Sequence, residues 1–378
     1  MMSNKQKILE SLNDTKLKIV AHTKLEGRTT RPELAQLFSV TPSSISQSVK
    51  ELVDHGILLE TDRVKSGRGQ PIIFLEMNPQ FCYSVGVSIQ NDEIGFCIID
   101  ACGAPVATYK FSGLFMDPLE TCNLIHEKYQ LILEESGIEP ESLIGMGIAM
   151  TGIFEKDGEE IWTPVEMDRW RGFNICEHFR KNFDFYLEIE NDGTAAALGE
   201  YLGGIGKQYK SFFYLFLGYG IGGGLMYNGH RFRGAHGNGA QIGAMIPLAP
   251  TVRASLTSLA QVLKRDHGSI STQEIEEMVN SRNPIFEQFV NEATLNLIGP
   301  LRAVTELFDP QAVIISGKFP RSALEMFASR IQLGNPLSEP NKRVPRPQVV
   351  VSDANFTVAP EYGAAHLPFH EIFSKYSI

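Results

Sequence analysis

Two segments of similar pattern, far apart in the chain, constrain the fold more than any other feature of the sequence. Residues 85–100 (VGVSIQNDEIGFCIID) and residues 217–229 (LGYGIGGGLMYNG) each contain an apolar strand, a short turn and a second apolar strand. Paired hairpins of this kind hold nucleotide phosphates when the turn is small enough for backbone N–H groups to approach an anion. Glycines fill the second segment, but the first turn is Gln90, Asn91 and Asp92. The two hairpins alone leave open whether the chain binds a nucleotide phosphate or only has the architecture of a protein that does.

The residues around these hairpins predict an α/β body. Apolar runs at 84–90, 94–100 and 106–111 are followed by a helical pattern at 119–135 and a buried strand at 144–150. Further strands are predicted at 185–190, 212–217, 223–227 and 312–316, with helices at 294–308 and 359–373. Strands in hairpins that alternate with helices are typical of this fold class.

The first 78 residues have a different character and predict a helix-turn-helix. A helical pattern covers 16–25, and Thr30 and Pro32 begin a second helix. Thr41 and Pro42 repeat this start signal before a third helix over 42–55. In that helix Ile45, Val49, Leu52 and Val53 share one face, and the opposite face presents Ser43, Ser44, Ser46, Gln47 and Lys50. Short hydroxyl side chains let a helix enter a groove of DNA, where Gln reads adenine and Lys reaches phosphate or guanine.

A basic wing is predicted after this helix. The segments 57–59 and 72–75 are two short strands, and the loop between them carries Arg63, Lys65 and Arg68 among glycines. Residues 1–80 contain 11 Lys and Arg against 9 Asp and Glu, so this head is +2 while the whole chain is −10. A basic head on an acidic body favours local DNA contact. The alternative is that the helix-turn-helix belongs to an ordinary helical domain with a solvated serine face.

The length and composition of the chain limit which classes of protein it can belong to. The 378 residues exceed one ordinary domain, and no apolar run reaches the ~20 residues that span a bilayer. The first residues lack an apolar signal core. Five scattered cysteines form no CxxC pair, which indicates reduced thiols rather than a disulfide framework. We therefore expect a cytoplasmic protein that does not contact membranes.

Several short motifs, in one order along nearly the whole chain, resemble the ROK family of repressors, open reading frames and kinases. They are GRGQP, GIAMTGIF, DRWRGF, ENDGTAAALGE, LGYGIGGGLMYNG, GNGAQIG, FDPQAVIISG and YGAAHL. The resemblance implies an actin-like, two-lobed body, and the winged head is similar to the regulator branch with xylose and N-acetylglucosamine repressors. The expected division is a winged helix-turn-helix domain at 1–78, a first lobe at 79–190 completed by a helix at 360–378, and a second lobe at 191–359.

Departures from the family pattern predict that catalysis is lost. Family kinases carry Asp-x-Gly-Gly-Thr in the first hairpin, where this chain has Ser88 and then Gln90, Asn91 and Asp92. Tyr219 occupies the position of a smaller threonine in the second hairpin. The glycines at 222–224 remain, and we interpret them as permitting a tight turn. We expect no nucleotide cofactor and no catalytic residue.

The family's zinc site is also predicted to be absent. The segment after Gly243 contains no cysteine, and Gln241 and Ala244 stand where the family has Glu and a zinc-binding His. We therefore expect no metal, and a loop held by packing around Pro247 and Pro250.

The sugar pocket implied by the resemblance is partly retained. Asn191 and Asp192 match the family's Asn-Asp pair, in which the Asp is the base of the kinases. A carboxylate beside an amide can hold vicinal hydroxyls. The other expected effector-binding residues are Thr151, Gly152, Glu166 and Gln241. The alternative for Asn191-Asp192 is a helix N-cap before the alanine-rich helix that follows.

These features predict a sugar-responsive DNA-binding repressor with a catalytically inactive kinase-like body. The expected partners are operator DNA, a sugar or sugar-phosphate effector, and further copies of the chain in a homodimer or homotetramer. One alternative is an active sugar kinase with an accessory head. Another is a regulator whose body only oligomerises or docks a protein partner.

Overall fold

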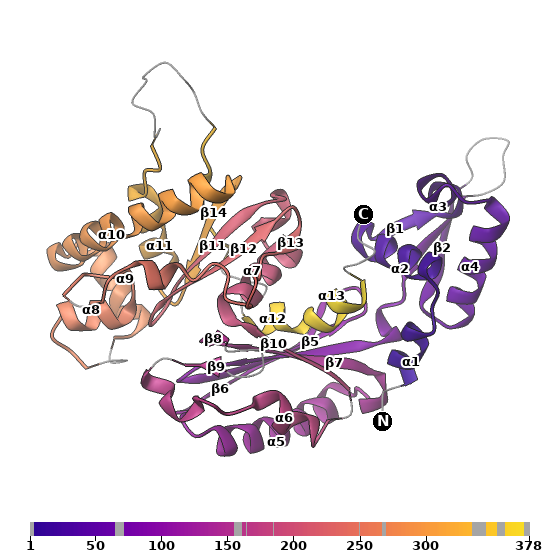
Figure 1. Ribbon diagram of the computed structural model, residues 1–378, viewed down its shortest axis with the longest axis horizontal. Helices are drawn as coiled ribbons and strands as arrows, with labels where there is room; N and C mark the ends of the chain where they lie inside the picture. Colours follow the sequence, from indigo (N-terminus) through magenta and orange to yellow (C-terminus); the bar gives the residue numbers. More distant parts are fainter. Residues whose placement is uncertain are drawn as a thin grey trace. The chain divides into compact units, whose positions relative to one another are not determined.

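The computed structural model describes residues 4–64, 72–154, 161–163, 165–183, 185–248, 250–266, 270–334, 345–353 and 360–373 (Figure 1). Its contacts divide the chain into two compact units. The first unit consists of residues 1–148, 166–189 and 364–378, and the second of residues 149–165 and 190–363. Within the described ranges, no helix combines the length and apolar character needed to cross a membrane.

The first unit begins with a winged helix-turn-helix, as predicted. Its helices are α1 (Asn4–Glu10), α2 (Asp14–Glu26), α3 (Arg31–Phe38) and α4 (Pro42–Asp54). The wing strands β2 (Leu58–Val64) and β3 (Ile72–Met77) pair antiparallel, and β1 (Arg28–Thr30) completes the sheet in the order β1-β3-β2. The short β1 and α1 were not predicted; β1 is a strand only because it pairs with β3, which lies more than 40 residues further along the chain.

Local side chains fix where the helices of this head begin. The Thr30 and Glu33 side chains form a capping box on α3, with the Thr30 N–H 2.8 Å from Glu33 Oε2. Thr41 caps α4 by accepting from the Ser44 N–H at 3.3 Å. Each such cap stabilises a helix by about 1 kcal/mol. The buried face of α4 then places Ile45, Val49 and Leu52 in the core, all fully buried.

The rest of the first unit is a five-stranded sheet with helices. The strands β4 (Tyr83–Ile89), β5 (Glu93–Asp100) and β6 (Pro105–Ser112) form an antiparallel meander, and β7 (Leu143–Met150) and β10 (Tyr186–Asn191) extend it in the order β10-β7-β4-β5-β6. The helices are α5 (Pro118–Ser136), α6 (Ile175–Arg180) and α13 (Leu367–Phe373), and α12 (Pro360–Ala365) crosses from the second unit into the first.

The second unit contains another five-stranded sheet, ordered β13-β12-β11-β14-β15. Its strands are β11 (Phe212–Leu217), β12 (Ile221–Tyr227), β13 (His230–Arg231), β14 (Ala312–Gly317) and β15 (Gln348–Val351). Its helices are α7 (Asp192–Gly203), α8 (Leu256–Val262), α9 (Thr272–Asn280), α10 (Pro284–Phe308) and α11 (Arg321–Arg330). The small hairpin β8 (Ile153–Phe154) and β9 (Ile161–Trp162) also belongs to this unit.

The two large sheets follow the same strand order. In each, three consecutive strands form the meander, the fourth strand pairs with the first, and the fifth pairs with the fourth. This duplication was not predicted, because equal topology does not require similar sequence. Together with the winged head, it confirms the predicted α/β class.

The glycines of the second hairpin permit close packing rather than a turn, which corrects our interpretation of residues 222–224. They lie within β12, and the turn itself is formed by Gly218, Tyr219 and Gly220. A Cβ at Gly224 would lie 2.4 Å from the Gly193 carbonyl oxygen of α7, and one at Gly193 would lie 2.5 Å from the Gly223 oxygen. Side chains at these positions would push α7 away from the sheet, so glycine is required for the packing.

Candidate DNA-binding face and effector site

The exposed face of α4 carries all five residues that the sequence predicted for DNA contact. Ser43, Ser44, Ser46, Gln47 and Lys50 are exposed, whereas Ile45, Ser48 and Val49 between them are buried. The Gln47 side-chain amide donates a long hydrogen bond to Glu51 Oε1, at 3.4 Å. The face is thus polar and exposed, and its short side chains keep the backbone close to a partner, which suits insertion into a groove of DNA.

The wing residues are only partly described. Arg63 lies in β2, where it pairs with Ile73 in the strand register. Lys65 and Arg68 lie outside the described residues. Their role as basic wing contacts therefore remains a prediction from the sequence.

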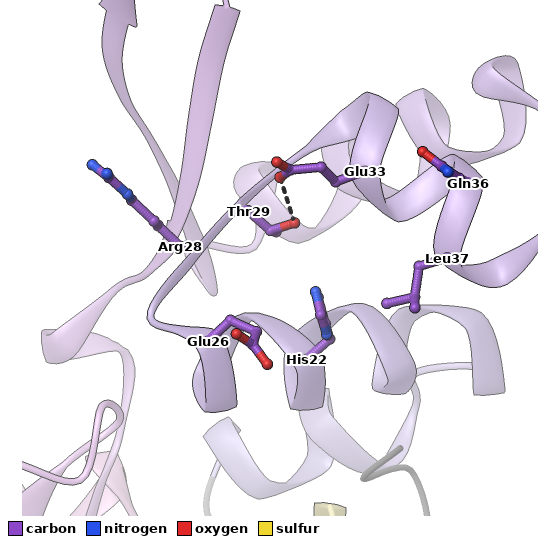
Figure 2. Close-up of a pocket in the computed structure, with 7 residues that line it drawn as sticks. All are labelled: His22, Glu26, Arg28, Thr29, Glu33, Gln36 and Leu37. Carbon is purple, nitrogen blue, oxygen red and sulfur yellow. Dashed lines mark hydrogen bonds between the residues drawn. The ribbon is translucent and has the colours of Figure 1, made fainter.

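The head also contains a groove away from α4 (Figure 2). It encloses about 610 Å³ between α2, β1 and α3, and none of its seven lining residues comes from α4. Inside it, the Thr29 hydroxyl donates to Glu33 at 3.4 Å, and Glu33 also caps α3. Of the two acidic residues that line this groove, Glu33 is thus already used to hold the helix-turn-helix together.

In the second unit, Asp192 and Thr151 meet at the start of α7. The Thr151 hydroxyl donates to Asp192 Oδ2 at 2.6 Å, and the Gly193 N–H donates to Oδ1 at 2.9 Å. Burial raises the pKa of the Asp192 carboxyl, an effect that the Thr151 hydroxyl opposes. Each carboxylate oxygen keeps acceptor capacity for a further donor, such as a ligand hydroxyl.

Asn191 next to it is the N-cap of α7. Its Oδ1 accepts from the N–H groups of Gly193 and Thr194, at 3.0 and 3.3 Å. Its Nδ2 donates to the Gly152 carbonyl oxygen at 3.1 Å. The cap alternative therefore describes Asn191, and the side chain with more capacity for a ligand is Asp192.

A buried ion pair that sequence reasoning missed lies immediately before this pair. Glu190 is fully buried, and its Oε2 lies 2.8 Å from Arg231 Nη1 and 3.0 Å from Arg233 Nε. Its Oε1 accepts from the Asn191 N–H at 2.9 Å. The alternation of Arg231 and Arg233 along the chain was the available signal, since it places both on one side of an extended segment. The ion pair fixes the end of β10 and hence the start of α7.

Gln241 has a donor without a partner. Its Nε2 is buried and has no hydrogen-bond acceptor among the described residues. An unsatisfied buried amide costs about 1–3 kcal/mol, so a ligand oxygen that accepts from it would recover that energy. Gln241 follows Ala240, whose carbonyl oxygen would lie 2.5 Å from a Cβ on Gly223, the glycine beneath α7. Asp192 thus has acceptor capacity and Gln241 a donor to offer, and their joint use by one effector remains a prediction from the sequence.

Glu166 is not brought to this cluster by the described structure. Its backbone lies in the 3-10 turn Val165–Trp170, within the first unit, and its side chain is outside the described part. Its role as an effector ligand remains a prediction.

The turn of each hairpin makes contacts with other segments of its own unit. In the first, the Asn91 and Asp92 carbonyl oxygens accept from the N–H groups of Phe115 and Gly113, at 3.0 and 3.1 Å. In the second, Lys318 Nζ lies 4.7 Å from the centre of the Tyr219 ring. The turn of the second hairpin thus carries an aromatic ring in contact with a cation.

Arg253 holds the loop in which the sequence lacks zinc ligands. Its guanidinium donates to the carbonyl oxygen of Gly243 at 2.9 Å, to that of Ile246, and to that of Pro247 at 3.4 Å. The backbone N–H of Arg253 donates to Ser258 Oγ of α8 at 3.0 Å. Arg253 thus joins three carbonyls of the loop to α8, through its side chain and its backbone, where the sequence predicted packing alone. No group of three or more His, Cys, Asp or Glu side chains suited to a metal occurs among the described residues.

Replacing Arg253 by methionine is expected to lower the free energy of unfolding by about 2–4 kcal/mol, since it leaves partly buried carbonyls without donors. Chemical denaturation of the full chain measures this loss. Arg302→Met, an exposed position on α10, removes the same charge and should change stability by less than about 0.5 kcal/mol. Equal stabilities of the two variants would show that Arg253 does not hold the loop.

Comparison with known proteins agrees with this architecture. The ROK family model matches residues 84–332, and a winged helix-turn-helix DNA-binding model matches residues 12–58. An uncharacterized protein of Sinorhizobium fredii is 27% identical over 91% of the chain and 87% of its own length. The xylose repressor of Bacillus subtilis is 24% identical over 75% of the chain and 77% of its own length. The crystal structure of a ROK family transcriptional regulator, a homologue of the E. coli Mlc protein, has a TM-score of 0.74 at 16% identity and covers 96% of this chain and 98% of its own.

Proposed function

The chain belongs to the ROK family, and from that membership we propose that it is a sugar-responsive transcriptional repressor. The observation that carries the proposal is the exposed polar face of α4 in the winged head. Relatives named as xylose repressors support it. Two heads in a homodimer or homotetramer would contact two operator half-sites, and the protein would act in the cytoplasm.

The effector that we propose is a sugar or sugar phosphate bound by the second unit. Asp192 supplies an acceptor for a hydroxyl, and the Gln241 amide supplies a donor that now lacks a partner. Thr151 and Asn191 position these groups, and Gly152 is tied to Asn191. Loss of the family's Glu and His at positions 241 and 244 changes the donor set, so the preferred sugar should differ from that of zinc-containing relatives.

Thermal unfolding with a panel of sugars tests this proposal. The panel is D-xylose, D-glucose, N-acetylglucosamine and the 6-phosphates of the last two. A ligand present at about 100 times its Kd stabilises the native state by about 2.7 kcal/mol and raises the unfolding temperature. The same compound should release the protein from a duplex selected from a random-sequence pool. If no sugar shifts unfolding while the selected duplex binds tightly, the alternative of a body that only oligomerises or docks a partner holds instead.

We expect no phosphate transfer from ATP to any sugar of this panel. The first turn is Gln90, Asn91 and Asp92 rather than glycines, and Tyr219 is a bulky residue in the second, so neither turn suits a phosphate. Without a bound nucleotide, Asp192 as a base has no phosphoryl group to transfer. A coupled ADP-release assay on the purified chain measures this. Turnover that disappears in Asp192→Asn would instead identify an active kinase with an accessory DNA-binding head.

A further inference from the structure

A lysine of the head reaches into the body of the first unit. Lys24 lies in the last turn of α2, and its Nζ donates to the Ala101 carbonyl oxygen at 2.5 Å. The same Nζ lies 4.2 Å from the centre of the Phe369 ring in α13. One ammonium group therefore touches the helix-turn-helix, the turn between β5 and β6, and the C-terminal helix. All three elements belong to the first unit.

The turn that receives Lys24 is rigid. Asp100 Oδ1 accepts from the N–H groups of Cys102 and Ala104, at 2.8 and 3.0 Å. The Ala101 N–H donates to the Pro79 carbonyl oxygen at 3.1 Å. At Gly103, with φ of +89°, an added Cβ would lie 2.6 Å from His366 Cε1. The Ala101 carbonyl thus belongs to a turn that is held by its own hydrogen bonds, and Gly103 of this turn packs against His366, between α12 and α13.

A cation at this position costs stability. Burial lowers the pKa of Lys24 to about 8, although Cys82, Cys102 and Asp100 favour its charged form. The Ala101 carbonyl oxygen offsets part of this penalty by accepting a hydrogen bond from the ammonium group. An ammonium group that donates to a carbonyl oxygen and also contacts an aromatic ring fixes the positions of both groups. The Lys24 contact therefore permits few orientations of the head relative to the turn between β5 and β6 and to α13. Lys24 thus has a geometric effect that an apolar contact between α2 and α13 lacks.

The C-terminal helices connect this contact to the effector site by a short stretch of chain. In the second unit, Gly363 of α12 packs against α7, where an added Cβ would lie 1.7 Å from the Ala195 carbonyl oxygen. In this helix α7, Asp192 is the first residue. Six residues after Gly363 in the sequence, Phe369 meets Lys24. A displacement of α7 therefore has a direct route through α12 and α13 to the head.

We propose that Lys24 is a positioning residue that fixes the orientation of the DNA-binding head, and that its contact with Ala101 and Phe369 transmits occupation of the effector site to α4. The second part rests on the proposed function; the first part does not. The contact acts on the orientation of the head and not on its folding, since the core of the head is formed by Ile19, Leu34, Ile45 and their neighbours.

Amide hydrogen exchange on the full chain tests the first part without any effector. Lys24→Met keeps the side-chain length and removes the cation, and Lys18→Met, at an exposed position of the same helix, removes the same charge. We expect exchange in the turn 101–104 and in α13 to quicken by about tenfold in Lys24→Met only. The unfolding temperature should fall by no more than a few degrees, because one carbonyl oxygen loses its donor. Unchanged exchange in Lys24→Met would overturn the proposal, as would an equal change in both variants.

Binding to the selected duplex with and without D-xylose, D-glucose 6-phosphate or N-acetylglucosamine 6-phosphate tests the second part. In the wild type and in Lys18→Met, the active sugar should weaken DNA binding by about tenfold or more. In Lys24→Met the same sugar should still raise the unfolding temperature but weaken DNA binding less than about twofold. Phe369→Leu should behave in the same way. If no sugar changes the DNA affinity of the wild type, the proposed function is wrong. The hydrogen-exchange result then still decides whether Lys24 positions the head.

Discussion

Reversing the charge of Lys50 on α4 is expected to weaken binding to the selected duplex by about 100-fold at moderate salt, because a carboxylate then faces the phosphates. Lys50 is exposed on the helix face that also carries Ser46 and Gln47, so the effect should be local and should not alter folding. Electrophoretic mobility shift at several salt concentrations measures both the affinity and its salt slope. The slope should decrease by about one for each phosphate contact that is lost.

The variant Gln47→Ala, on the same face of α4, removes a side chain that we expect to contact a base and leaves the phosphate contacts in place. Because an amide reads an adenine edge with two hydrogen bonds, this variant should lose about 1–3 kcal/mol of discrimination while keeping its salt slope. Repeating the duplex selection with this variant shows whether one base position becomes degenerate.

Lys207→Glu is the control for the charge reversal, since Lys207 is an exposed lysine of the second unit. It should bind DNA within about twofold of the wild type. Equal weakening by Lys50→Glu and Lys207→Glu would mean that overall charge decides affinity. Unaltered binding in Lys50→Glu would exclude α4 as the recognition helix.

Asp192→Asn should abolish the response to the active sugar and leave DNA binding intact. The carboxylate is the acceptor at the start of α7, and asparagine keeps its size but replaces one oxygen by a donor that opposes the Thr151 hydroxyl. Losing a charge-assisted hydrogen bond to a ligand hydroxyl costs about 2–4 kcal/mol, or about 30- to 1,000-fold in affinity. Titration calorimetry measures the affinity, and duplex binding with the sugar present measures the response.

The neighbouring Asn191→Ala gives the contrast that interprets this result. Asn191 caps α7 and holds Gly152, so this variant should lose about 1–2 kcal/mol of stability. Asp192→Asn should unfold within a few degrees of the wild type, because the cap remains. If Asp192→Asn is instead the less stable of the two, the carboxylate is structural. If the sugar response survives in folded Asp192→Asn, the effector binds elsewhere.

The local features of the head could be read from the sequence. The spacing of Ile45, Val49 and Leu52 predicted which face of α4 is buried, and Thr30 and Thr41 predicted where α3 and α4 begin. These signals are reliable because helix periodicity and capping depend on residues within one or two turns. The exposed face of α4 follows from the same spacing, so the candidate DNA-contacting residues needed no tertiary information.

The candidate effector site was predictable only in part. The sequence predicted Asn191, Asp192 and Thr151 as site residues. It did not predict that Asn191 caps α7 while the Asp192 carboxylate keeps acceptor capacity for a ligand. It depends on the backbone angles at the start of α7, where Asn191 is extended and Asp192 is the first helical residue. The unpartnered Gln241 amide and the Glu190 ion pair were also hidden, since both depend on which segments surround them.

The sequence by itself determined the winged head, the α/β class, the exposed face of α4 and the loss of zinc ligands, because each rests on residue type and short-range spacing. The duplicated strand order and the packing role of Gly223 and Gly224 were decided only by the tertiary structure. The same holds for the hydrogen bonds of Arg253 to its loop and for the contact of Lys24 with Ala101, 77 residues away. The physical reason is that these features depend on contacts between segments that are far apart in the sequence. Strand pairing, close packing and the hydrogen bonds of buried polar groups form only when folding brings such segments together, so the local spacing of residues does not predict them.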